Sequence, residues 1–137
     1  MMAGDNWLGQ VLTALETGPG WSSTAVFVTY DDCGCFYDHF RPPPGRGIRV
    51  PMVIASPYAI AGFTDTTPAN FASMMAFTEH VYGLAPLAFA DASAYDYAKS
   101  FNFAQAPQAA RPLSDHPVPA ASELQLTSNP LDPGDPS

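Results

Sequence analysis

Two adjacent carboxylates, Asp31 and Asp32, are the residues whose type and spacing best fit a chemical role. They follow an apolar run at residues 24–30, which we expect to be a buried strand ending where open α/β sheets place ligands. Ionised neighbours raise each other's pKa unless a cation neutralises them. A divalent metal ion that prefers oxygen donors, such as magnesium, calcium or manganese, would do this. The alternative is a solvated acidic turn in which one Asp caps the following loop.

The loop that follows holds more polar side chains. We expect Asp38 to fix either a histidine tautomer or the loop backbone behind the metal ligands. His39 either orders this loop or contacts a bound anion directly. The loop arginines either attract an anionic substrate or pair with nearby aspartates, and pairing is favoured for Arg49 because it begins a strand; the other two are Arg41 and Arg46.

The cysteines and the other histidines favour simpler interpretations. A disulfide between Cys33 and Cys35 would be strained, and a zinc site would need two further soft ligands, so we expect free thiols. His80 lies among apolar helical residues, which favours a packed or surface histidine over a catalytic one. His116 lies in a proline-rich segment and is not assigned a role.

The order of the predicted elements is helix, strand, loop, strand, helix. A helix capped by Asp5 or Asn6 precedes the first strand, and a second buried strand covers residues 50–55. A helix is predicted over residues 69–82, ended by Gly83, and a shorter one over 93–101. This order is typical of a parallel-sheet α/β sandwich. Two strands are too few for a complete one, so the chain pairs with another segment or is part of a larger sheet.

Length and composition set the outer limits. The 137 residues suffice for one modest domain, which we place at residues 1–103. Residues 104–137 include seven prolines and are expected to be an irregular or disordered tail. A net charge of −8 with five Lys and Arg argues against nucleic-acid binding. No apolar run is long enough to cross a bilayer and no signal-peptide pattern is present, so the sequence as written predicts a cytoplasmic protein.

A longer pattern is more specific than the Asp pair. Asp-Asp-x-Gly-x-Phe-Tyr-Asp-His at residues 31–39, followed by three prolines, Gly-Ile-Arg-Val-Pro at 47–51 and Ser-Pro-Tyr at 56–58, resembles the bacterial phosphoesterase family. That family includes phospholipases C and acid phosphatases and is related to the alkaline-phosphatase superfamily. The resemblance continues through further segments and covers residues 4–103; the segments are 71–74, 79–84 and 91–96.

The resemblance implies a fold, a reaction and an incomplete site. It implies an alkaline-phosphatase-like α/β fold in which Asp31 and Asp32 bind a metal ion of unspecified identity. The family's Ser or Thr nucleophile, its other metal ligands and its phosphate-binding histidines precede this segment and are not found here. We therefore expect the C-terminal portion of a hydrolase of phosphoric ester bonds, acting on a phospholipid or a phosphomonoester and inactive without the missing upstream half.

Two other interpretations remain. The first is a non-catalytic remnant that acts as a structural or binding module. The second, a stand-alone calcium-binding module, is weaker because the EF-hand ligand spacing is absent. Full-length members of the family are often exported, which leaves the localisation open.

Overall fold

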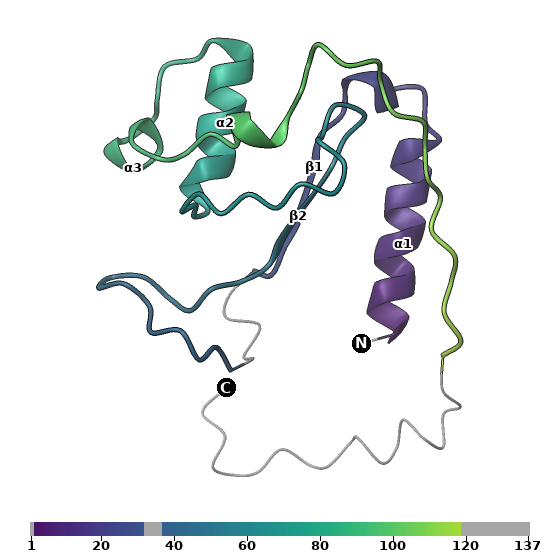
Figure 1. The fold of residues 1–137 in the computed structure, drawn as a ribbon, viewed down its shortest axis with the longest axis horizontal. Coiled ribbons are helices and arrows are strands. Elements are labelled where there is room, and N and C mark those ends of the chain that lie inside the picture. The colour runs from purple at the N-terminus through teal and green to yellow at the C-terminus, as the bar shows by residue number, and fades with distance from the viewer. Residues whose placement is uncertain (1, 32–36, 119–137) are drawn as a thin grey trace. The chain divides into compact units, whose positions relative to one another are not determined.

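The computed structural model describes residues 2–31 and 37–118 (Figure 1). Their Cα positions group into two units. Of the described residues, 2–18 and 110–118 form one unit, and those between 19 and 109 form the other. In the part of the chain that the structure describes, no helix is both long and apolar enough to span a membrane.

The first unit is one helix and an extended segment. Helix α1 covers Met2–Glu16 and so begins before the predicted caps, Asp5 and Asn6. The backbone of His116 exchanges hydrogen bonds of 2.7 and 2.8 Å with the side chain of Asn6. A Cβ atom at Gly9 would lie 3.5 Å from the side chain of Leu113, an ordinary van der Waals distance, so the extended segment packs against α1 at this position. Because Trp7 stays 64% exposed, the apolar stripe of α1 is only partly covered by the described residues.

The second unit contains a two-stranded sheet. Strands β1 (Val26–Thr29) and β2 (Met52–Ala55) pair antiparallel, with Val26 opposite Ala55 and Thr29 opposite Met52. The strand positions and the mixed helix and strand content agree with the predictions, but a parallel pairing of these strands is wrong. An apolar run indicates that a strand is buried, but it does not indicate whether the strand pairs parallel or antiparallel with its neighbour. Direction depends on the connection, and the described part of the 30–51 connection contains no crossover helix.

Aromatic rings form the core against one side of the sheet. Phe27 of β1 lies 5.0 Å from Phe77 of helix α2 (Ala72–Tyr82), measured between ring centroids. Phe77 in turn stacks on Phe101 at 4.9 Å, and Tyr97 lies 5.4 Å from Phe27. Such ring pairs add stabilisation beyond the area that they bury. The cluster therefore fixes α2 and the 97–101 segment on the sheet.

The ends of α2 follow from local hydrogen bonds. The side chain of Asn70 accepts the Ala72 N–H at 2.8 Å, so the helix begins after the predicted residue 69. Gly83 has φ +63°, and the Leu84 N–H donates to the carbonyl of Glu79, which ends the helix as predicted.

The helix predicted over 93–101 is wrong. Helix α3 covers Phe89–Ala92 instead, and a short 3-10 helix follows at Ala98–Ser100. A continuous helix is interrupted at Tyr97, which adopts a left-handed φ of 56°.

Candidate functional site

Asp31, which the sequence predicts to be a metal ligand, follows β1 with Tyr30 between them. It is exposed and therefore accessible to a cation. Asp32 lies outside the described residues, as do Cys33 and Cys35. The described residues contain no group of three or more His, Cys, Asp or Glu side chains arranged to hold a metal ion. Asp31 thus fits as one hard oxygen donor, and further ligands must come from other residues.

Asp38 is the centre of a hydrogen-bond cluster in the same loop. Its two carboxylate oxygens accept the Arg49 side chain at 2.8 and 2.9 Å, in a two-pronged ion pair. The same carboxylate accepts the backbone N–H groups of Phe40 at 3.0 Å and of Arg49 at 3.2 Å. The Arg49 guanidinium also lies 4.5 Å from the centroid of the Phe40 ring. The ion pair expected for Arg49 is present, and it joins residues from the two ends of the described loop.

These bonds hold Asp38 ionised. The Arg49 side chain, followed by the Phe40 N–H, holds the pKa of Asp38 well below its usual range. The same pair raises the pKa of Arg49. Asp38 therefore serves as an acceptor and is unsuited to donate a proton to a leaving group. Of the two roles predicted for Asp38, the geometry matches fixing the loop backbone.

His39 is adjacent to Asp38 but makes no hydrogen bond with it. Its Nδ1 atom is 4.0 Å from Asp38, too far for a hydrogen bond, and its side chain is 83% exposed. The structure therefore does not join His39 to Asp38. Arg41 and Arg46 are exposed in the same loop.

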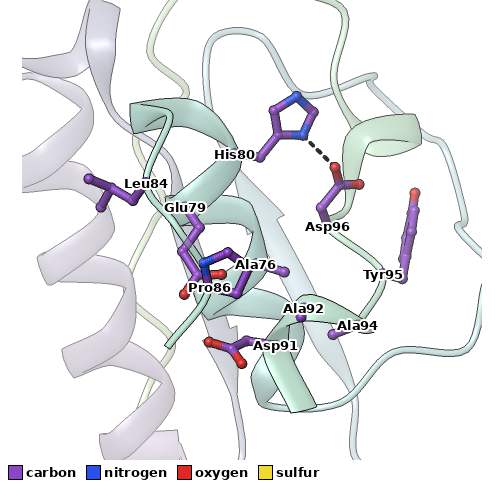
Figure 2. Close-up of a pocket in the computed structure, with 10 residues that line it drawn as sticks. All are labelled: Ala76, Glu79, His80, Leu84, Pro86, Asp91, Ala92, Ala94, Tyr95 and Asp96. Atoms are coloured by element: carbon purple, nitrogen blue, oxygen red, sulfur yellow. Dashed lines mark hydrogen bonds and ion pairs between the residues drawn. The ribbon is translucent and has the colours of Figure 1, made fainter. Parts of the chain in front are cut away.

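A pocket lies between α2, α3 and the segment that follows α3 (Figure 2). Its volume is about 430 Å³, and three carboxyl groups, a histidine and a tyrosine are among its ten lining residues. His80 Nδ1 lies 2.5 Å from a carboxylate oxygen of Asp96. Burial works to raise the pKa of Asp96, but the bonds from His80 and from the Ala98 N–H outweigh burial and lower the pKa. His80 is thus a surface histidine paired with an aspartate, which agrees with the simpler prediction.

Glu79 and Asp91 lie on another side of this pocket. Both residues are buried, at 7% and 6% exposed, and the N–H of Leu87 donates to both carboxyl groups, at 3.2 and 2.8 Å. No sequence pattern singles out this pair. A Glu on a predicted helix and an Asp twelve residues later carry no local signal, because their contact depends on how the chain turns at Gly83 and bends at residues 87–88.

A second cluster without a sequence signal is centred on Asp65. Its carboxylate accepts the hydroxyl of Tyr95 at 2.6 Å, the hydroxyl of Ser100 at 3.0 Å and the N–H of Thr67 at 2.9 Å. Tyr95 and Ser100 are 30 and 35 positions from Asp65 in the chain, so no spacing rule reveals the cluster. The cluster ties the 65–67 turn to the segment that carries the aromatic core.

Comparison with known proteins identifies the class of protein. The chain belongs to the phosphoesterase family, which matches residues 1–85. This range contains the Asp31-Asp32 pair, the Asp38 cluster, both strands and α2. The resemblance noted in the sequence is therefore confirmed.

Individual relatives are phospholipases C from bacteria and a plant. Phospholipase C A of Mycobacterium tuberculosis is 27% identical over 130 residues, covering 72% of this chain and 25% of that protein. A non-hemolytic phospholipase C of Burkholderia pseudomallei is 30% identical over 104 residues, covering 53% and 15%. A non-specific phospholipase C of Arabidopsis thaliana is 32% identical over 79 residues, covering 43% and 15%. The chain thus spans a quarter or less of the length of these relatives.

Proposed function

We propose that this chain is the C-terminal part of a phosphoesterase domain that hydrolyses phosphoric ester bonds by metal-assisted phosphoryl transfer. The observation that carries the proposal is the family match over residues 1–85, which includes Asp31 and Asp32. The phospholipase C relatives favour a phospholipid substrate, and a soluble phosphomonoester is the alternative within the same class. The nucleophile is supplied by the upstream part of the domain.

Each loop residue has a distinct role in this proposal. Asp31 and Asp32 provide carboxylate oxygens for a divalent cation, which when bound stabilises negative charge on the phosphate oxygens. The Asp38–Arg49 pair holds the loop that carries them, and its charges neutralise each other. His39, with its side chain 83% exposed, is available to contact the phosphate.

The partner in this proposal is the upstream half of the same domain. Strands β1 and β2 form a two-stranded sheet, and Val53 of β2 is 60% exposed. Two strands seldom form a stable sheet by themselves, and sheets of this class are usually larger. Further strands and covering helices from the upstream half would complete the sheet and bring the nucleophile to Asp31.

A hybrid enzyme tests the proposal. Residues 1–103 replace the matching segment of the M. tuberculosis relative, and hydrolysis of p-nitrophenyl phosphate and of phospholipid vesicles is measured together with metal content. We expect turnover and bound metal in the hybrid. Asp31→Asn and Asp32→Asn should each reduce turnover by about 100-fold, because each removes a charged oxygen donor from the cation. Asp5→Asn is the control, because Asp5 is exposed on α1.

The outcomes separate the two functions. Unchanged turnover in both variants would remove Asp31 and Asp32 from the site. A hybrid that folds and retains metal without hydrolysing either substrate would support the alternative, a non-catalytic binding module. We expect no turnover from the 137-residue chain by itself, and robust hydrolysis by it would contradict the assignment of the nucleophile to the upstream part.

A further inference from the structure

The turn between α2 and α3 is held by two carboxyl groups that meet at one donor. Leu87 N–H donates to Glu79 Oε1 and to Asp91 Oδ2, and the Ala88 N–H donates to the other Asp91 oxygen at 2.9 Å. Glu79 belongs to α2 and Asp91 to α3, so these bonds connect the two helices. Figure 2 shows the two side chains on the part of the pocket away from the His80–Asp96 contact.

Two buried carboxylates at one N–H are stable only if a proton or a cation reduces their repulsion. The other titratable groups that line the pocket are His80, Tyr95 and Asp96, and the described lining residues include no Lys or Arg. His80 is directed to Asp96. No permanent positive charge therefore faces the Glu79–Asp91 pair within the described pocket, and the described residues offer no third His, Cys, Asp or Glu that would complete a metal site with the pair. A shared proton is the simplest way to relieve the repulsion.

We propose that Glu79 and Asp91 form a pH-sensitive latch, which closes the turn at residues 84–92 while the pair shares one proton and loosens it when both are ionised. The turn that the latch holds is apolar and exposed. Leu87 and Phe89 are 78% and 87% exposed, so few side-chain contacts hold the turn in place of the two carboxyl groups. The inference is independent of the proposed function, because it uses neither Asp31 nor a metal ion.

The direction of the pH effect follows from the two titrations. Burial and the nearby Asp91 raise the pKa of Glu79 above its ordinary 4.5. Burial by itself would raise the pKa of Asp91. The hydrogen bonds with the Leu87 N–H and with Glu79 outweigh burial and lower the pKa of Asp91 below its ordinary 3.8. The proton on Glu79 stabilises the turn at low pH, and this stabilisation is lost as the pH rises through the raised pKa of Glu79. The Asp91 charge stabilises it above pH 3.8, and this is lost as the pH falls through the lowered pKa.

Amide hydrogen exchange on the 137-residue chain tests the latch. Protection of the Leu87 and Ala88 amides, corrected for intrinsic rates, should fall by about tenfold or more between about pH 4.5 and about pH 8. In Glu79→Gln the side chain stays neutral, so this dependence should disappear. Glu16→Gln makes the same chemical change on α1 and should leave the dependence intact.

Two further measurements distinguish loss of the latch from loss of the fold. The Thr67 amide, which donates to Asp65 in the same unit, reports whether a variant is still folded. The side-chain carboxyl of Glu79 can be titrated directly by NMR in the unaltered chain. A pKa at or below the ordinary 4.5, or Leu87 protection that stays constant with pH, would overturn the latch.

Discussion

At the scale of single residues, Asp38 organises the described part of the loop between β1 and β2. Its carboxylate accepts hydrogen bonds from the Arg49 side chain and from two backbone N–H groups, so one side chain connects two loop positions that are eleven residues apart, its own and that of Arg49. The sequence could predict that Arg49 would pair with an aspartate, because a charge at the beginning of a strand commonly finds a nearby partner. It could not show that His39 Nδ1 lies 4.0 Å from Asp38, beyond hydrogen-bond distance, because that depends on the loop backbone.

The first prediction concerns this cluster. Asp38→Asn removes the charge that Arg49 binds and should speed amide exchange at Phe40 and Arg49 by about tenfold, because the loop then opens locally. Arg46→Gln, at an exposed residue of the same loop, is the control and should have little effect. Since the pKa of Asp38 is lowered, wild-type protection should persist above pH 3.8 and be lost as the pH falls through the lowered pKa. Equal exchange in both variants would contradict the role of Asp38.

A second residue-scale prediction concerns the bond between Tyr95 and Asp65. Tyr95→Phe removes a hydroxyl that donates to an ionised carboxylate and should lower the free energy of unfolding by about 2 kcal/mol in urea titrations. Tyr37→Phe is the matched control, because that side chain is 92% exposed.

The same bond has a pH signature. Burial opposes ionisation of Asp65, but bonds from Tyr95 and Thr67 outweigh it and lower the pKa of Asp65 to about 2. Its contribution to stability should hold above pH 3.8 and disappear as the pH falls toward about 2. Tyr95→Phe should reduce this acid-dependent loss. An unfolding curve of the variant that keeps the full wild-type dependence on pH would contradict the prediction.

At the scale of elements, the sequence predicted where the strands and helix α2 lie better than it predicted how the strands pair. The apolar runs at 24–30 and 50–55 contain β1 and β2, and Gly83 ends α2 as expected, because burial and left-handed glycines leave local signals. The antiparallel pairing had no such signal. The error over 93–101 arose because Tyr97 adopts φ 56° within an aromatic cluster, and only tertiary contacts can impose that conformation.

The element-scale prediction compares two glycines, Gly83 and Gly4, each of which has open space where a Cβ atom would lie. Only Gly83 has a positive φ, so Gly83→Ala should destabilise the chain by about 1 kcal/mol. Gly4→Ala lies within α1 and should stabilise that helix by up to about 1 kcal/mol. Thermal unfolding followed by circular dichroism measures both. Equal shifts in the same direction would show that backbone conformation at Gly83 does not control the end of α2.

At the scale of the whole molecule, the family match and the small sheet both favour the proposal that this chain is part of a larger domain. The chain covers 25% of the length of the M. tuberculosis relative, and its described residues form a sheet of only two strands. The sequence predicted that these strands would need neighbours, because nearly continuous apolar strands bury both faces. It could not identify such neighbours, since under the proposed function their residues belong to another segment.

The last prediction follows from the outer edges of that sheet. In the isolated chain, alternate amides of β1 and β2 point away from the partner strand and should exchange rapidly, because nothing in the two-stranded pairing protects them. In the hybrid with the upstream half, a new neighbouring strand should slow exchange along at least one edge by about 100-fold or more. The Val28 and Val53 pair, opposite each other in the register, marks the sheet in both proteins. Equally fast exchange at both edges in an active hybrid would mean that the upstream half completes the catalytic site without adding a strand to this sheet. The expected parallel-sheet sandwich would then be wrong for the neighbours of β1 and β2, as it already is for the pairing of β1 with β2.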